Sequence, residues 1–299
     1  MMISLKEIEH KLEELPLLPD VVVRLLQLNP NDDAFFDQVL ALSQEDPTFA
    51  LQVIRLGNSA SSAPISQIKS LEEAVARVGA DAIAGLITSM AVLRVFVPVH
   101  PGEKKLWIHS IQVAVIAKNI TSKLTHLKID PNQAYLSGLL HDIGRFVMFD
   151  KAAPQLQEVE EKNFKSPEQL IEAELSIYGF NHSELGGKVC KKWGLPEVVR
   201  QIVAYHHMYS DKKQKAIQNY DAQLSNLLKV VQLADRLSVL LTNDPDTIKW
   251  PDEQLLPALQ DCILPSLSTL DIKANHLKSI VQFADKETRR MLMGLQILT

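Results

Sequence analysis

Apolar residues recur along most of the chain at the three- and four-residue spacing that places side chains on one face of a helix. Leu224, Leu228 and Val231 show this spacing within a stretch that we expect to be helical over 221–242. No segment alternates apolar and polar residues over the length of a strand. The pattern therefore predicts an all-α fold.

Capping residues locate several helix ends. Asp46-Pro47 supplies an N-cap followed by a proline in the first turn, Ser70 with Glu73 forms a capping box, and Gly194-Leu195-Pro196 separates two helices. Together with the apolar spacing, these signals predict helices near 5–15, 21–28, 33–43, 47–56, 74–78, 81–96, 104–126, 132–149, 167–177, 182–193, 196–208, 221–242, 253–264 and 273–296.

The segment 97–103 carries two prolines and a glycine directly after a long apolar helix. Such a composition is typical of a linker. We therefore expect two parts, residues 1–98 and residues 104–299. The segment 208–218 is polar and rich in lysine, which predicts a solvated loop.

Composition limits the class of protein. With 299 residues and 46% hydrophobic residues, the chain can form a substantial core. A net charge of −5 gives no basic surface for DNA, and no apolar run reaches the roughly 18 residues of a membrane span. Two cysteines and an N-terminus unlike a signal peptide favour a reducing compartment. We expect a cytoplasmic protein that binds neither DNA nor membrane.

Several histidines and two aspartates fall on faces that are otherwise apolar. Asp235 shares a stripe with Leu224, Leu228 and Val231, where an unpaired carboxylate would be costly to bury. A divalent metal is a strong partner for such groups. The candidate ligands, in chain order, are His109, His141, Asp142, His182, His206, His207 and Asp235.

Imidazoles combined with carboxylates suit Fe, Mn, Ni, Zn or Mg, and two carboxylates balance one or two divalent ions. Such a site attracts an anionic ligand such as a phosphate. Other interpretations remain open. A single histidine on an apolar face is usually a satisfied core residue, and the same side chains could form a buried network without metal.

The order of a histidine, the doublet His141-Asp142 and a later aspartate resembles the HD superfamily of metal-dependent phosphohydrolases. More closely, the chain resembles HDOD domain proteins, HD-related output domains of bacterial signalling, over residues 12 to 215. The motifs that carry this resemblance are Leu15-Pro16-Leu17-Leu18-Pro19, Asp46-Pro47, Leu56-Gly57-Asn58-Ser59-Ala60, the stretch from Leu71 to Gly79, and the region from His182 to His207.

The resemblance implies an N-terminal helical part packed on an HD-like metal-binding bundle with a C-terminal helical extension. HDOD domains commonly lack the complete ligand set, whereas every HD ligand has a counterpart here. His182, His206 and His207 are similar to the additional histidines of HD-GYP relatives, which hold a second metal and hydrolyse cyclic di-GMP. The Gly-Tyr-Pro triplet of those relatives is missing, because Met208-Tyr209-Ser210 follows His207.

Two further positions differ from those relatives. Arg145 stands where HD-GYP proteins have lysine, and Lys105 stands where some members place an acid for a third metal. The resemblance implies that Asp142 bridges two ions. One ion would be held with His109, His141 and Asp235, and the other with His182, His206 and His207.

We expect a signalling or regulatory HDOD module with a retained HD-type metal site that does not hydrolyse cyclic di-GMP. It would work with a signalling protein partner or with a phosphate or nucleotide ligand. The alternative is a metal-dependent phosphohydrolase acting on a nucleotide or cyclic dinucleotide, with Asp142 and Arg145 as candidate catalytic residues. Arg145, Lys188, Lys192 and Arg236 are the candidates to meet a phosphate's charge.

Overall fold

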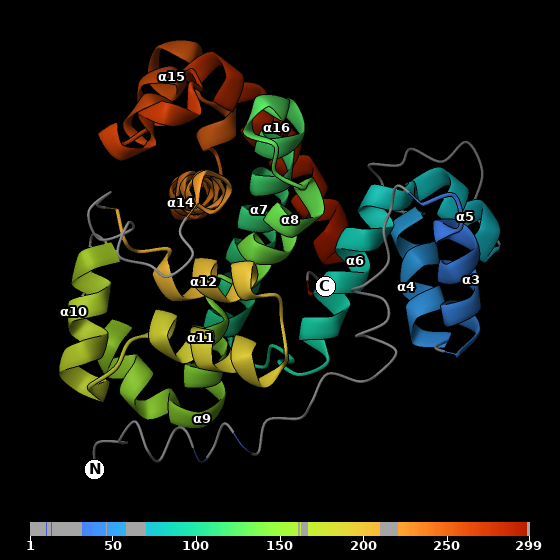
Figure 1. Cartoon of the computed structure of the whole chain (residues 1–299), viewed down its shortest axis with the longest axis horizontal. Helices are drawn as coiled ribbons and strands as arrows, with labels where there is room; N and C mark the ends of the chain where they lie inside the picture. Colours follow the sequence, from blue (N-terminus) through green and yellow to red (C-terminus); the bar gives the residue numbers. More distant parts are fainter. Residues whose placement is uncertain are drawn as a thin grey trace.

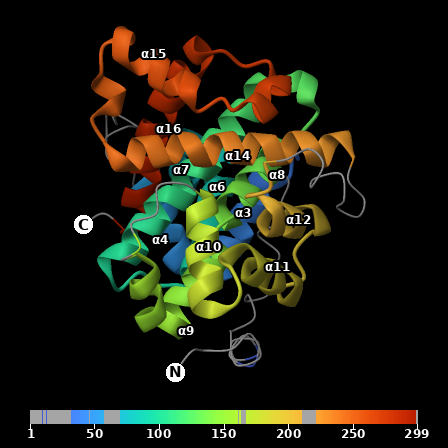
Figure 2. The same cartoon turned by 90° about the vertical axis from the view of Figure 1, so that its left-hand side faces the viewer.

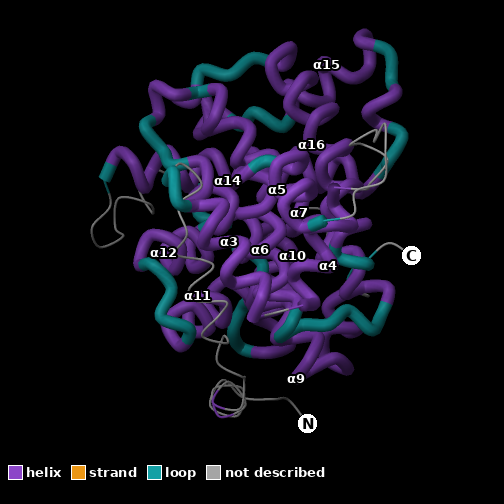
Figure 3. The backbone as a smooth tube through the Cα atoms, turned by 90° about the vertical axis from the view of Figure 1, so that its right-hand side faces the viewer, coloured by secondary structure: helices purple, strands orange, loops and turns teal. Residues whose placement is uncertain are grey.

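The structure is a computed structural model that describes residues 10, 13, 32–45, 47–57, 70–160, 162, 167–209 and 221–297. Over these residues the chain forms helices and loops and no strand, as Figure 3 shows. The prediction of an all-α fold is confirmed. The helices expected near 5–15 and 21–28, the motif at 15–19 and most of the motif at 56–60 lie outside the described residues.

The helices follow one another with short connections. Before the expected linker, the described residues form α3 (Phe35–Glu45), α4 (Pro47–Gly57), α5 (Leu71–Val78) and α6 (Ala80–Leu93). After it come α7 (Pro101–Lys123), η2 (Thr125–Leu127), α8 (Pro131–Leu140), α9 (Ile143–Glu160), α10 (Pro167–Tyr178), α11 (His182–Lys192), α12 (Glu197–Tyr205), α14 (Ala222–Asn243), η3 (Thr247–Lys249), α15 (Asp252–Asp261), η4 (Pro265–Leu270) and α16 (Ala274–Gly294).

Helices α7 and α8 lie in the middle of the molecule. Helices α3, α4 and α5 gather at one end, and α9 to α12 gather at the other (Figure 1). Helix α14 crosses the bundle between α15 and α12 and packs against α7 and α8 (Figure 2). None of the described helices combines the length and the apolar character that a bilayer span requires.

Helix starts agree with the capping residues of the sequence. Ser70 accepts a hydrogen bond from the backbone N–H of Glu73 at 3.1 Å, and Gly79 ends α5 with a φ of +85°. Asn181 caps α11 by accepting from the backbone N–H of Glu184 at 2.9 Å. This cap fixes His182 as the first residue of α11.

The prediction of a single helix over 132–149 is wrong. Helix α8 ends at Leu140, α9 begins at Ile143 and continues to Glu160, and the doublet His141-Asp142 lies at the break. In an unbroken helix the carbonyl of Gly138 would accept from the backbone N–H of Asp142. Here the imidazole Nδ1 of His141 donates a hydrogen bond to that carbonyl at 2.7 Å. This side-chain hydrogen bond competes with the backbone hydrogen bond of the helix, and it occurs at the turn between α8 and α9.

Glycines permit two close helix crossings around this break. A Cβ atom at Gly138 would lie 2.9 Å from the Cα of Ala114, so α7 and α8 approach backbone to backbone. A Cβ atom at Gly144 would collide with the backbone carbonyl oxygen of His182. The first crossing brings α7 to the doublet, and the second brings the start of α11 to it.

The expected linker is shorter than 97–103, because α7 begins at Pro101. Just before it, Phe96 is buried and packs against Phe146 and Trp193, with ring centroids 5.6 and 6.1 Å apart. The indole Nε1 of Trp107 donates to the carbonyl of Phe96 at 3.0 Å. The division into residues 1–98 and 104–299 stays a prediction.

The C-terminal helix α16 packs on the core. It contacts both α4 and α7, and its buried side chains include Leu277, Ile280 and Val281. It therefore ties the helices before the expected linker to those after it.

Candidate metal centre

The seven side chains predicted as ligands converge on one region between five helical segments. His109 lies in α7, His182 begins α11, and Asp235 lies in α14. The other four occupy breaks or ends of helices: His141 and Asp142 between α8 and α9, and His206 and His207 directly after α12.

Asp142 lies at the centre and presents its two carboxylate oxygens to different imidazoles. Its Oδ1 lies 3.2 Å from Nε2 of His182 and 3.5 Å from Nε2 of His206. Its Oδ2 lies 3.7 Å from Nε2 of His141 and 3.9 Å from Nε2 of His109. One carboxylate thus faces two groups of nitrogen ligands, one through each oxygen.

The first group consists of His109, His141, Asp142 and Asp235. The Nε2 atoms of His109 and His141 are 3.2 Å apart. Asp235 Oδ1 lies 3.3 Å from Nε2 of His109 and 4.0 Å from Nε2 of His141. The ligand atoms of His109, His141 and Asp142 lie within 4.8 Å of one another, and Asp235 lies beside the two imidazoles.

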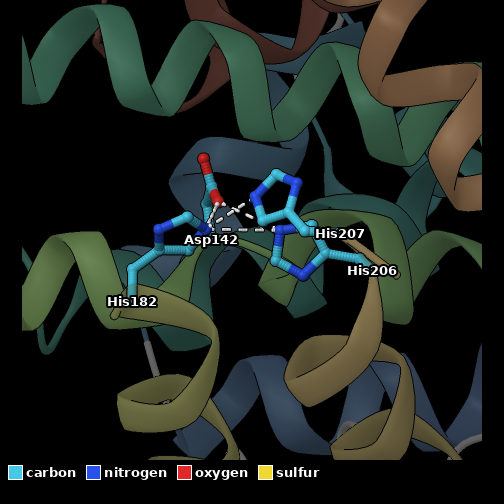
Figure 4. A group of neighbouring side chains, drawn as sticks. All are labelled: Asp142, His182, His206 and His207. Carbon is cyan, nitrogen blue, oxygen red and sulfur yellow. Dashed lines mark hydrogen bonds and ion pairs between the residues drawn. The ribbon is translucent and has the colours of Figure 1, made fainter. Parts of the chain in front are cut away.

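The second group consists of Asp142, His182, His206 and His207, drawn in Figure 4. Nε2 of His182 lies 2.9 Å from Nε2 of His207 and 3.4 Å from Nε2 of His206. One ligand atom from each of the four residues lies within 4.8 Å of every other. This is the spacing of atoms arranged around a single ion.

The opposite ring nitrogens have acceptors that fix the tautomers. Nδ1 of His141 donates to the carbonyl of Gly138, and Nδ1 of His206 donates to the carbonyl of Val203 at 2.9 Å. A carbonyl can only accept, so the proton sits on Nδ1, and in the neutral ring Nε2 presents a lone pair to the centre. This is the orientation that a metal-binding imidazole adopts.

Glu174 is a part of the site that the sequence analysis missed. Its carboxylate is fully buried and accepts from Nδ1 of His182 at 2.7 Å and from the backbone N–H of His182 at 2.8 Å. Its signal in the sequence is the one that pointed to Asp235: it lies on the apolar stripe of α10 with Leu170 and Ile177. A carboxylate behind an imidazole raises the basicity of a metal ligand.

Two polar residues of α14 were also missed. The hydroxyl of Ser238 lies 2.9 Å from Nδ1 of His109 and donates to Oε1 of Gln112 at 2.8 Å. The amide of Gln232 donates to the carbonyls of His206 and Met208, each at 2.9 Å. Both residues hold histidines of the centre in place without facing it.

The charges of the site balance one another. Burial acts to lower the pKa of His182, but the carboxylates of Glu174 and Asp142 outweigh it and raise the pKa to about 10. Burial acts to raise the pKa of Asp142, yet the neighbouring His141 and His182 hold it well below its ordinary value. Without a metal, His182 is a cation between two carboxylates, at a place where a divalent ion would supply the positive charge.

Other members of the site remain neutral or unsatisfied. Burial lowers the pKa of His141 to about 4, so its ring is uncharged at neutral pH. Nδ1 of His207 and the hydroxyl of Tyr209 are buried and have no hydrogen-bond partner among the described residues. Tyr209 lies close enough to Asp235 for that carboxylate to add to burial in raising the pKa of the phenol.

Arg236, one of the basic residues predicted to meet a phosphate, instead bonds to the end of another helix. Arg236 donates from Nε to the carbonyl of Cys262 and from Nη2 to the carbonyl of Asp261, each at 3.1 Å. These carbonyls belong to the C-terminal end of α15, so Arg236 caps that helix. Arg145 is half-buried in the first turn of α9, three residues after Asp142.

The residues present fit a divalent metal. Five imidazoles and two carboxylates form a mixed donor set, their outer nitrogens are largely anchored, and their inner atoms crowd at 2.9 to 4.0 Å. Mutual hydrogen bonds cannot satisfy several Nε2 lone pairs that face one another. We therefore treat this cluster as a candidate metal centre.

The fold and the site together define an all-helical protein of the HD type. The chain belongs to the HDOD family: the model of the HDOD domain matches residues 15–209. The family resemblance expected over residues 12 to 215 is confirmed.

Solved structures share the fold. An HDOD domain protein with unknown function from Geobacter sulfurreducens is 24% identical, with a TM-score of 0.70 over 98% of this chain and 96% of that one. A candidate phosphohydrolase from Shewanella amazonensis SB2B is 21% identical, with a TM-score of 0.70 over 97% of this chain and 98% of that one. At these identities the likeness concerns the fold.

Two curated relatives match by sequence. An uncharacterized protein of Treponema pallidum (strain Nichols) is 27% identical over 205 residues, which cover 67% of this chain and 39% of that protein. Ribonuclease Y of Mesoplasma florum is 28% identical over 131 residues, which cover 44% of this chain and 18% of that protein. The chain thus matches less than half the length of either relative.

Proposed function

We propose that this chain is a regulatory HDOD module that retains a dinuclear HD-type metal centre and uses it to hold its helices together. The observation that carries the proposal is the position of Asp142. Its two oxygens face separate groups of imidazoles, which is the arrangement of a carboxylate that bridges two ions. Fe, Mn, Ni, Zn and Mg are all compatible with the donor set.

The residues of the centre would act as a clamp. One group joins α7, the α8–α9 break and α14, and the other joins the same break to α11 and the end of α12. Bound ions would supply positive charge to two carboxylates in the core and Lewis acidity to any coordinated ligand. Asp142, as the shared member, would couple the two groups into one unit.

Two features favour a module over a hydrolase of cyclic di-GMP. The residues after His207 are Met208-Tyr209-Ser210 in place of Gly-Tyr-Pro. Most ligand side chains are also deeply buried: His109 exposes 13%, His141, His182 and His206 expose 1% or less, and His207 is partly buried. Such a centre suits a structural or sensing role better than access by a bulky substrate.

The second candidate is a metal-dependent phosphohydrolase acting on a nucleotide or cyclic dinucleotide. It is favoured by the completeness of the ligand set, and the names of the Shewanella amazonensis and Mesoplasma florum relatives agree with it. Asp142 and Arg145 would be the candidate catalytic residues. A metal-bound phosphate would find Arg145 beside the doublet.

Metal content and turnover separate these functions. The purified chain would be analysed for metal, loaded with Mn or Fe, and assayed against an aryl phosphodiester and cyclic di-GMP. Near-stoichiometric metal without turnover supports the module. Turnover that is lost in Asp142→Ala and kept in Asp150→Ala, an exposed control, establishes the hydrolase instead.

Absence of bound metal after loading would overturn both functions and leave a metal-free polar network. An anomalous-scattering map of crystals shows whether metal is bound without any measurement of activity. It reports whether ions lie on the two sides of Asp142 and which element they are.

A further inference from the structure

A second candidate site lies away from the metal centre. A cavity of about 500 Å³ opens between α6, α7, α8 and α16, and none of its lining residues belongs to the centre. The volume is in the range of pockets that hold small-molecule ligands.

Two helix stripes line part of this cavity. Helix α7 contributes Val115, Lys118, Asn119 and Ser122, and α16 contributes Phe283, Glu287, Arg290 and Met291. The positions follow the offsets 0, 3, 4 and 7 in α7 and 0, 4, 7 and 8 in α16, which place the members of each set on one face of the helix. The walls therefore combine apolar side chains with two cations and one carboxylate.

Arg290 gives the cavity a cation. Its side chain is 12% exposed, and its Nε is buried without a hydrogen-bond partner among the described residues. Its Nη1 lies 3.5 Å from Oε2 of Glu287, so the carboxylate holds the other side of the guanidinium. The charged guanidinium lines the cavity and would attract an anion bound there.

Other groups add positive potential at the same place. Lys118 lines the cavity from α7, and its Nζ donates to Oδ1 of Asn132 at 2.9 Å and sits 5.9 Å from the ring centroid of Tyr135. Helix α6 begins at the cavity with Gly79 as an N-cap that supplies no side-chain hydrogen bond. The first turn of a helix carries a partial positive charge and free N–H groups.

The cavity also has features that suit the remainder of a ligand. Asn119 also lines the cavity, and a side-chain amide carries both donors and an acceptor. At the mouth, Phe283 is 49% exposed, which leaves an aromatic face open to solvent beside the cavity.

We infer that this cavity binds a small phosphate-bearing molecule of about mononucleotide size. The phosphate would lie between Arg290, Lys118 and the start of α6, because two cations against the one carboxylate of Glu287 leave a net positive charge. The body of the molecule would contact Phe283 and present a donor to Asn119. Such a ligand would contact helices from both sides of the expected linker.

The test measures binding of two probes, inorganic phosphate and adenosine 5′-monophosphate, by titration calorimetry and thermal shift at constant ionic strength. Arg290→Met should weaken the binding of both probes roughly tenfold, since it removes a charged hydrogen-bond donor. Arg289→Met is the matched control, because Arg289 points outward and pairs with Asp285 at 3.0 Å. Its affinity should stay within about twofold of the unchanged chain.

Lys118→Met, in the α7 part of the lining, should produce the same loss of affinity, and it replaces Arg290→Met as the test if that variant does not fold. Equal affinity in Arg290→Met and Arg289→Met would place the phosphate elsewhere, for example at the metal centre, and would overturn the proposal. Failure of the unchanged chain to bind either probe would overturn it as well. Neither result depends on whether the metal centre is catalytic.

Discussion

At the scale of single residues, the centre depends on side chains that do not face the ions themselves. Glu174 holds the outer nitrogen of His182, and Ser238 lies against that of His109. These contacts fix which nitrogen carries the proton and therefore which one presents a lone pair. The metal affinity of the centre should depend as much on these partners as on the ligands themselves.

Glu174→Gln tests this dependence. The substitution keeps the size of the side chain but removes the charge that supports His182, so metal affinity should fall roughly 10- to 100-fold. A competition titration against a chelator measures the change. Glu172→Gln, at an exposed position of the same helix, is the control and should bind metal normally.

An unchanged affinity in Glu174→Gln would mean that the carboxylate is only a packing partner of α11. The circular dichroism spectrum of the variant should be recorded alongside, because a loss of helix would give the same fall in affinity for a different reason.

At the scale of helices, the centre forms because two pairs of helices approach unusually closely. Gly138 lets α8 touch the backbone of α7, and Gly144 lets α9 touch the start of α11. Side chains at these crossings would separate the helices by more than the tolerance of a coordination sphere. The sequence Gly138-Leu139-Leu140-His141-Asp142-Ile143-Gly144 is therefore a ligand doublet between two contact glycines.

Gly144→Ala should disrupt this arrangement. The added Cβ meets the carbonyl oxygen of His182, a backbone atom that cannot rotate away, so the helices must shift. We expect a loss of about 1–3 kcal/mol in the free energy of unfolding, together with weaker metal binding. Chemical denaturation and metal titration measure the two effects.

The control is Gly294→Ala at the end of α16, where a Cβ would meet the side chain of Leu56 at an ordinary 3.4 Å. It should leave both quantities nearly unchanged. If Gly144→Ala binds metal as tightly as the unchanged chain, the crossing does not position His182.

Arg236→Met tests the link between α14 and α15. Removing the guanidinium leaves the carbonyls of Asp261 and Cys262 without their donor, so the unfolding free energy should fall by about 1–2 kcal/mol. Metal affinity should not change, because Arg236 points away from the centre. Arg200→Met, which removes an exposed pair with Glu197, should alter stability by less than about 1 kcal/mol.

At the scale of the whole molecule, the centre joins segments that lie up to 126 positions apart, the span from 109 to 235. A metal that binds only the folded arrangement stabilises the fold in proportion to the logarithm of its concentration. When the ion leaves, the carboxylates of Asp142 and Asp235 would keep only the neighbouring imidazoles as partners.

Removal of metal with a chelator should therefore lower the midpoint of thermal unfolding by several degrees. Mn or Fe added back in excess of the chelator should restore it. The same treatment of Asp142→Ala should produce little change. A chain whose unfolding midpoint is indifferent to chelator and metal would contradict the clamp proposed here.

The sequence by itself was sufficient for the helical class and the order of most described helices. It also pointed to seven side chains that the structure brings together, and their role as metal ligands stays a prediction. Helical period and capping residues act locally, so they can be read without the fold. The same local signals wrongly predicted one helix over 132–149. There the carbonyl of Gly138 accepts a hydrogen bond from the imidazole of His141 in place of a backbone N–H. Glu174 was also missed, although the apolar stripe of α10 carried the signal.

Only the tertiary structure decided which atoms meet. The direction of Asp142 between two groups, the support of His182 by Glu174, and the cavity beside Arg290 all depend on how helices distant in the sequence cross. Those crossings are set by close backbone approach and side-chain packing, which involve pairs of residues far apart along the chain. A periodic pattern specifies which face of a helix turns inward. It does not specify which face of which other helix will pack against that face.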